Sequence, residues 1–197
     1  MILDATAGNR VIWRTKNPEN VIFIDLEKKL ERPPTIFADN RKLPFQDKTF
    51  SMIYFDPPHA WSWDSIYFGF PDRESFLKYR TNRNDRVPTY YGMNVYKSKT
   101  ALLTAIYYAQ KELRRVLTDT GVLWFNWSEL KISLRKTLVC FNDDWIELIR
   151  LRTGSKNQTL ANTPNFWVCL AKAEPPEKQE VLETFIPMEP QLVFAQG

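Results

Sequence analysis

A carboxylate, two prolines and the only histidine of the chain stand together as Asp56-Pro57-Pro58-His59. They directly follow the strand-forming run 51–55, SMIYF. Two successive prolines fix φ and stiffen the turn, so the carboxylate and the carbonyls beside it are held in one direction. A plain strand terminator could have the same composition, and a single histidine is more often structural than catalytic. The position of His59 directly after Asp-Pro-Pro favours contact with a substrate.

Asp56 is the last of four carboxylates that each end a short apolar run. The other three are Asp4, Asp25 and Asp39. The runs, 2–4, 21–25, 35–38 and 51–55, have the composition of buried parallel strands. In open α/β sheets, ligands bind beyond the carboxyl ends of the strands. Asp also favours turns, so one or two such acids would need no explanation. Four acids at one edge predict a binding site.

The turn after the first run consists of small residues, Asp4-Ala5-Thr6-Ala7-Gly8-Asn9, and lets the backbone approach a ligand closely. It lacks the G-x-G-x-x-G fingerprint, and the chain contains no G-x-x-x-x-G-K-[ST] phosphate loop. An acid at the end of the second strand, here Asp25, can accept from two ribose hydroxyls. These features predict a nucleoside-like cofactor without a pyrophosphate.

The elements that would position these residues continue beyond residue 98. Apolar spacing predicts a helix over 99–117, and VLWF (122–125) reads as a fifth strand after a turn at Asp119-Thr120. Ser128 could cap the next helix. Residues 145–151 and 166–171 then form a closing antiparallel pair. The fold class is therefore α/β, a mostly parallel sheet of seven strands.

Two segments fit no element of this sheet. Residues 59–98 interleave ten aromatic side chains with six Lys and Arg, and we expect them to form a substrate lid in which aromatics stack bases and cations track phosphates. The alternative is that Phe68, Phe70 and Phe76 only pack a small separate core. Residues 173–197 are Pro-rich and carry five Glu and one Lys, so we expect an extended acidic arm. Residues 1–172 hold the opposite charge, which suits a nucleic-acid partner or simply keeps the surface soluble.

Composition narrows the class of protein further. A chain of 197 residues is long enough for one domain with a sizeable core. No apolar segment approaches the roughly 20 residues that span a bilayer, and the N-terminus lacks the pattern of a signal peptide. Cys140 and Cys169 are too few for a disulfide framework. We therefore expect reduced thiols, a cytoplasmic location and no membrane partner.

Four segments of the sequence resemble a known family. The segments ILDATAGNRVIW (2–13), ADNRKLPFQDKTFSMIYFDPPH (38–59), ELRRVLTDTGVLWFNWSE (112–129) and FWVCLAK (166–172) are similar to class I S-adenosylmethionine-dependent methyltransferases. They look most like the small phage-type form of the branch with an Asp-Pro-Pro-(Tyr/His/Trp) motif, which methylates amino groups in nucleic acid. The resemblance implies a Rossmann-like sheet with helices on both faces, formed by a catalytic domain over 1–172.

The resemblance also implies a role for each candidate site residue. Asp4 and the Thr6-Ala7-Gly8 turn would hold the methionine end of S-adenosylmethionine. Asp25, with Leu26 beside it, would take the ribose hydroxyls, and Asp39 with Asn40 the adenine amine. The substrate base would meet His59, Trp61, Tyr91 and Trp127, with a core position as the alternative for Trp127. No metal is expected. The chain departs from the family pattern in a glycine-poor first turn and in having no helix before the first strand, so one wall of the methionine pocket would be absent or supplied from elsewhere.

The implied reaction is methyl transfer to an exocyclic base amine, whose lone pair is delocalised into the ring. Asp56 and the Pro57 carbonyl would each accept one N–H bond, which favours a tetrahedral nitrogen. The expected product is N6-methyladenine in DNA, and a base inside a duplex would have to be flipped out. Alternatives are an RNA amine, either guanine N2 or adenine N6, and a non-catalytic cofactor-binding subunit. Target recognition would come from the lid, a dimer mate or a partner protein.

Overall fold

The computed structural model describes residues 1–28, 30–61, 96–153 and 163–173. Its strands are β1 (Ile2–Asp4), β2 (Val21–Asp25), β3 (Ile36–Phe37), β4 (Phe50–Phe55), β5 (Leu117–Ser128), β6 (Trp145–Thr153) and β7 (Asn165–Lys172). The helices are α2 (Lys99–Val116), the short α3 (Leu134–Leu138) and the 3-10 helix η3 (Val139–Asp144). None of the described helices is long and apolar enough to span a membrane.

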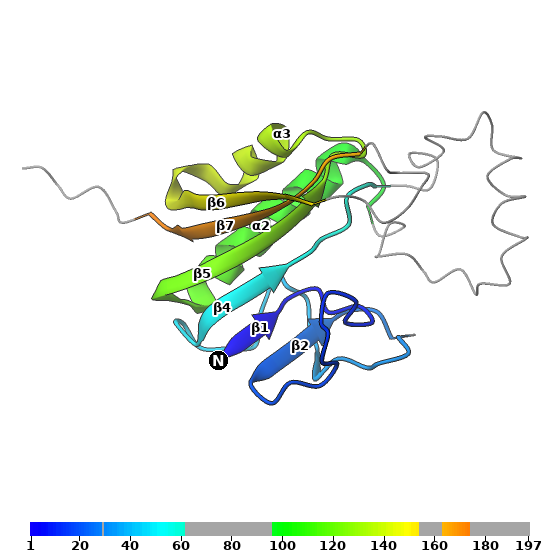
Figure 1. Ribbon diagram of the computed structural model, residues 1–197, viewed down its shortest axis with the longest axis vertical. Coiled ribbons are helices and arrows are strands. Elements are labelled where there is room, and N and C mark those ends of the chain that lie inside the picture. Colours follow the sequence, from blue (N-terminus) through cyan, green and yellow to red (C-terminus); the bar gives the residue numbers. More distant parts are fainter. Residues whose placement is uncertain (29, 62–95, 154–162, 174–197) are drawn as a thin grey trace, which may run out of the picture.

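The strands form one sheet in the order β3-β2-β1-β4-β5-β7-β6 (Figure 1). The pairs among β1 to β5 are parallel, and β7 pairs antiparallel with both β5 and β6. This confirms the predicted mostly parallel sheet with an antiparallel last hairpin. The chain runs outward from β1 to β3 and then returns to place β4 on the other side of β1, so β1 and β4 flank the point where ligands bind in such sheets.

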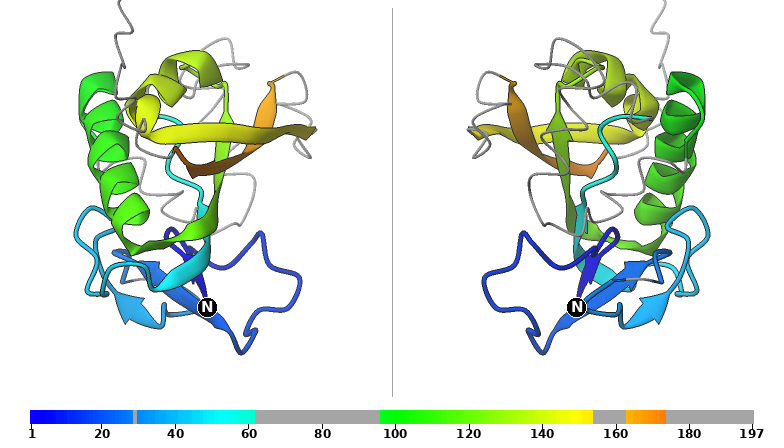
Figure 2. Two further views of the ribbon diagram at one scale, coloured as in Figure 1. Left: turned by 90° about the vertical axis from the view of Figure 1, so that its left-hand side faces the viewer. Right: turned by 90° about the vertical axis from the view of Figure 1, so that its right-hand side faces the viewer.

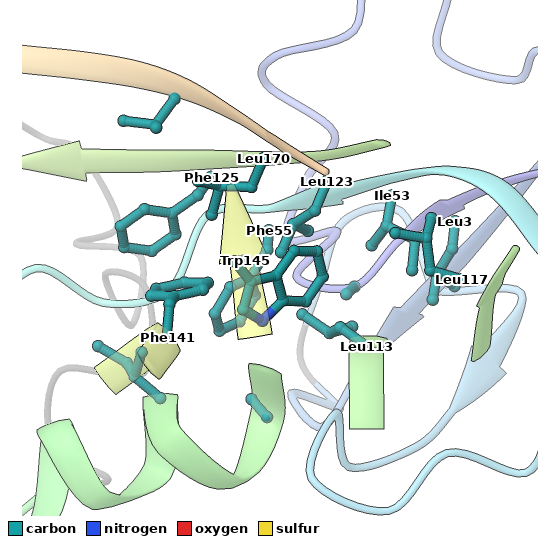
Figure 3. Close-up of a cluster of buried hydrophobic side chains, with 14 of the residues drawn as sticks. Leu3, Ile53, Phe55, Leu113, Leu117, Leu123, Phe125, Phe141, Trp145 and Leu170 are labelled. Atoms are coloured by element: carbon teal, nitrogen blue, oxygen red, sulfur yellow. The ribbon is translucent and has the colours of Figure 1, made fainter. Parts of the chain in front are cut away.

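The main core lies between the sheet and α2. Leu102, Ile106 and Leu113 recur at helical spacing and are fully buried against the strands. Figure 3 shows Leu113 within this core. Burial of each such side chain contributes about 1.5–3 kcal/mol. Ser98 begins the helix, because its hydroxyl accepts from the Ala101 N–H at 3.1 Å. The α2 helix therefore holds β4 and β5 from one side, and with them the residues that follow these strands.

The described helices all pack on one face of the sheet (Figure 2). On the other face, over β1 and β2, lies the connection between these two strands. Its Trp13 ring meets Phe23 and Tyr54 edge-on at centroid distances of 5.6 and 5.1 Å. Helices were expected on both faces of the sheet. Among the described residues, helices cover one face. Most of the expected lid (62–95) and nearly all of the acidic arm (174–197) lie outside the described residues.

Two local predictions are wrong. The Asp119-Thr120 turn lies inside β5, where the pairing with β4 jumps from Phe50↔Leu117 to Met52↔Val122. The turn signal therefore marks extra residues within a strand rather than a boundary. Ser128 does not cap a helix, because it is the last residue of β5, and the N–H of Leu134 at the start of α3 donates to Glu129 Oε1 at 2.7 Å.

Candidate active site

Asp56 directly follows β4 and is held by three neighbours. Its backbone N–H donates to Thr6 Oγ1 at 2.7 Å, which ties the tip of β4 to the turn after β1. Its carboxylate Oδ1 accepts from Asn126 Nδ2 at 3.0 Å and lies 3.3 Å from His59 Nε2. The side chain is 16% exposed. The carboxylate is therefore fixed in orientation and still reachable from solvent.

Two buried polar atoms beside Asp56 have no hydrogen-bond partner among the described residues. They are His59 Nδ1 and Asn126 Oδ1, and each belongs to a side chain whose other polar atom contacts the Asp56 carboxylate. A buried polar atom without a partner costs about 1–3 kcal/mol, and such atoms in native proteins generally have a water, ion or ligand to satisfy them. Each of the two side chains that contact Asp56 thus keeps one polar atom for a further partner, such as water or a ligand.

Asp4 is buried at the end of β1, with 1% of its surface exposed. Its oxygens accept from the Thr6 N–H at 3.1 Å and from Trp13 Nε1 at 2.7 Å. Burial raises the pKa of Asp4 to about 6, against the lowering effect of these two hydrogen bonds, and the nearby charges of Asp56 and Asp25 raise it further. Three carboxylates therefore lie close enough to influence one another at the carboxyl edge of the sheet.

The turn after Asp4 is shaped by Gly8, which has a positive φ of 46°. Its N–H donates to Asp25 Oδ2 at 2.8 Å, so the turn after β1 is joined to the end of β2. A Cβ on Gly8 would meet nothing within 4 Å. The space over this turn is therefore open, as a turn that receives a ligand requires.

A hollow joins this turn to Asp56. It is lined by Asp4, Thr6, Ala7, Asn9, Val11, Ile12 and Asp56, and its volume is about 10 Å³, which is room for about one water molecule. Small-molecule sites usually measure about 300–1,000 Å³. Val11 and Ile12 form an exposed apolar rim. A ligand of nucleoside size would therefore enter by displacing this rim.

Asp25 and Asp39 lie along the same edge but outside the lining of this hollow. Asp25 accepts from the N–H groups of Gly8 and Glu27, both at 2.8 Å, and each carboxylate oxygen retains a lone pair for a further donor. Asp39 forms a two-pronged pair with Arg41, and these hydrogen bonds lower the pKa of Asp39. Asn40 donates to the Ala5 carbonyl at 3.3 Å, whereas Leu26 is exposed.

The structure places the residues expected to contact the substrate in different environments. Trp127 is fully buried and donates to the Ile132 carbonyl at 2.8 Å, so it is a core residue and does not line a base pocket. Its ring instead meets the His59 ring edge-on at 5.2 Å and supports it. Trp61 is half-buried against the core. Tyr91 lies outside the described residues.

Sequence reasoning overlooked Asn126 and assigned no site role to Trp13. Asn126 stands one residue beyond the VLWF run at the carboxyl end of β5, and β5 is the neighbour of β4 in the sheet. The argument that selected the acids at strand ends would have selected this amide too, had it been extended to the fifth strand. Trp13 is far from any strand end, and nothing in the sequence signals that its indole reaches Asp4.

No protein-family model matches the sequence, and no curated protein is significantly similar to it. Among solved structures, the chain is similar to the PH0226 protein of Pyrococcus horikoshii OT3, with 12% identity, 87% of this chain and 81% of that chain covered, and a TM-score of 0.53. PH0851 matches with 14% identity, 87% and 42% coverage, and a TM-score of 0.50, so the matched part is under half of that protein.

A weaker likeness is to the N-methyltransferase NodS of Bradyrhizobium japonicum WM9, solved in complex with S-adenosyl-L-homocysteine, with 12% identity, 88% and 78% coverage, and a TM-score of 0.47. At such low identity, a structural likeness establishes the fold and not the activity. The match to the PH0226 protein, which covers most of both chains at a TM-score of 0.53, supports the overall fold. The chain thus has a Rossmann-like α/β fold with a mostly parallel seven-stranded sheet.

Proposed function

We propose that this chain transfers a methyl group from S-adenosylmethionine to an exocyclic amine of a nucleic-acid base, with adenine N6 in DNA as the favoured acceptor. The observation that carries the proposal is the setting of Asp56. Its carboxylate lies at the tip of β4, is oriented by Asn126 and His59, and lines the same hollow as the turn after β1. This is the arrangement expected of an amine acceptor site beside a cofactor site.

The residues of the first turn fit the cofactor. The Asp4 carboxylate would accept from the ammonium of the methionine end, and the open space over Gly8 would admit the chain that follows it. The free lone pairs of Asp25 would accept from the ribose hydroxyls. S-adenosylmethionine, when bound, supplies a methyl group activated by a sulfonium.

The protein would act on the amine by positioning and by hydrogen bonding. Because Asn126 and His59 both contact Oδ1 of Asp56, the substrate amine would donate one N–H bond to Oδ2. The Pro57 carbonyl would accept the second N–H bond, and the nitrogen lone pair would then point at the methyl group. The nitrogen would take the methyl group, the sulfur would keep the electron pair of the broken carbon–sulfur bond and leave as a neutral thioether, and the nitrogen would lose its proton to water afterwards. No general base is required before the transfer.

Charge supports a nucleic-acid substrate. The net charge of the whole chain is +4, and residues 173–197 contain five Glu and one Lys, so the body of the protein is strongly basic. A basic surface attracts a polyanion and promotes its encounter with the site. Recognition of a particular sequence would require the lid, a second copy of the chain or a partner protein.

The test compares three versions of the full chain: wild type, Asp56→Ala and Asp119→Ala. Asp119 is an exposed carboxylate in the first half of β5, away from the carboxyl edge of the sheet, and serves as the matched control. Cofactor binding is measured by calorimetry. Methyl transfer is measured with radiolabelled S-adenosylmethionine against DNA, RNA and protein pools, followed by digestion of the product to nucleosides.

We expect wild type and Asp119→Ala to label DNA as N6-methyladenine, and Asp56→Ala to lose about 100-fold or more of this activity. Labelling of RNA instead would assign the alternative substrate. The proposal fails if the wild type does not bind S-adenosylmethionine, or if Asp56→Ala labels every pool as well as the wild type does. Binding without transfer to any pool would identify a non-catalytic cofactor-binding subunit.

A further inference from the structure

Half of the sheet presents an apolar face away from the helices. The pairing registers place Tyr54, Trp124, Cys169 and Ile149 in one row across β4, β5, β7 and β6. Trp167 and Leu151 form part of the next row, and Ala171 and Ile146 part of another. The residues that alternate with them, such as Leu123, Phe125 and Leu170, face the helices and are buried. We call this surface the open sheet face.

The open sheet face is exposed at its outer strand. Ile146 and Ile149 are each 50% exposed and Leu151 is 49% exposed, although all three belong to β6 and are directed to the same side. The connection that covers β1 and β2 reaches this side only as far as the contact of Trp13 with Tyr54. In the part of the chain that the structure describes, no helix packs here (Figure 2). Contiguous exposed apolar surface of this kind usually marks a docking site.

The chain supplies a matching segment directly beyond β7. Between Pro176 and Pro187, the sequence EKQEVLETFI places its large apolar residues at Val181, Leu182, Phe185 and Ile186. Spacing of this kind is typical of one side of a helix. Pro176 at the beginning and two Glu residues in the first turn are favourable at a helix N-terminus. Although the prolines of 173–197 favour an extended arm overall, these ten residues have the pattern of an amphipathic helix.

The start of this segment is anchored beside the open sheet face. The Ala173 N–H donates to the Asp144 carbonyl at 2.9 Å, and Arg114 Nη2 donates to the Ala173 carbonyl at 3.1 Å. Cys169 lies near the middle of the face. It precedes Ala173 by four residues of β7, which corresponds to about 13 Å at the rise of a strand. The three residues 174–176 can span up to about 10 Å when extended, and the four helical residues 177–180 add about 6 Å, so Val181 can lie up to about 16 Å from Ala173. The segment therefore reaches the face without strain.

We propose that residues 177–186 dock on the open sheet face of the same chain, with Val181, Leu182, Phe185 and Ile186 packed over Ile146, Ile149, Leu151 and Trp167. A short tether gives the segment a millimolar effective concentration at the face, which favours it over a second copy of the chain. The acidic segment also complements the basic body of the protein. Docking would cover the exposed apolar side chains of β6, the outermost strand of the sheet. The proposal does not depend on methyl transfer.

The experiment places a photo-crosslinking amino acid at position 149 of the full chain, with position 139 as the matched control. Val139 is 73% exposed but belongs to η3, on the helix side of the sheet. After irradiation, mass spectrometry identifies the crosslinked peptide, and a denaturing gel separates single chains from joined ones. We expect an adduct between position 149 and residues 177–186 within one chain, at least ten times more abundant than from position 139.

A second pair of variants tests the apolar stripe itself. Phe185→Ser/Ile186→Ser should reduce the adduct from position 149 at least fivefold, whereas Glu180→Gln/Thr184→Ser, on the opposite side of the helical pattern, should leave it unchanged. An adduct that joins two chains would assign the face to a second copy, and an adduct on residues 62–95 would assign it to the lid. Either result overturns the proposal, as does the absence of any protein adduct from position 149.

Discussion

Replacement of Asp4 by Asn should make the protein more stable at neutral pH and less able to bind its cofactor. Asp4 is buried with 1% exposure, and burial raises its pKa from 3.8 to about 6. A raised pKa means that the folded state tolerates the protonated carboxyl better than the ionised one. The contribution of Asp4 to stability is therefore fully present below pH 3.8 and is lost as the pH rises through about 6.

The size of the effect follows from the shift. One pKa unit corresponds to about 1.4 kcal/mol, so a shift of this size represents about 3 kcal/mol at most. Asn has the shape of the protonated carboxyl, but its Nδ2 cannot accept a hydrogen bond, so the variant loses one of the bonds from Thr6 and Trp13 at every pH, which costs about 1 kcal/mol. We therefore expect Asp4→Asn to be about 1 kcal/mol less stable than wild type near pH 4, and more stable than wild type by up to about 2 kcal/mol near pH 8.

Urea denaturation of both proteins between pH 4 and pH 8 measures this difference. Other carboxylates titrate in both proteins, so their contributions largely cancel and the difference isolates Asp4. Calorimetry on the same samples should show weaker binding of S-adenosylmethionine to the variant at neutral pH. A stability difference that does not change with pH, or a wild type that is the more stable protein at pH 8, would refute the reasoning about Asp4.

Three further outcomes are expected. Binding of S-adenosylmethionine to the wild type should weaken about tenfold from pH 7.5 to pH 5, because only the ionised Asp4 accepts from the ammonium; a calorimetric affinity independent of pH would contradict this. Asn126→Leu should lower kcat about 10- to 100-fold in the labelling assay with cofactor affinity within about twofold, because Asp56 loses its orienting donor; an unchanged kcat would show that the amide is dispensable. Gly121→Ala should lower the free energy of unfolding by about 1–3 kcal/mol in urea denaturation, because its Cβ would lie 2.6 Å from Leu117 Cδ1; a loss below about 0.5 kcal/mol would mean that Leu117 moves aside freely.

The strands and their acids were predictable because the relevant information is local. Short apolar runs such as 21–25 specify buried strands by composition alone, and parallel pairing then brings the residues that end them to one edge. The stiff turn at Pro57 and the helix over 99–116 are likewise properties of adjacent residues. The edge at which Asp4, Asp25 and Asp56 gather could therefore be foreseen from the chain itself.

The partners of those acids were decided only by the tertiary structure. Asn126 meets Asp56 because β5 lies beside β4, and Trp13 meets Asp4 because a connection of irregular shape folds back over the sheet. Trp127 belongs to the core because of the side of β5 from which it projects, which depends on a register set by the extra residues before Val122. Contacts of this kind depend on strand order and register over long separations in the chain, and no local pattern of residues encodes them.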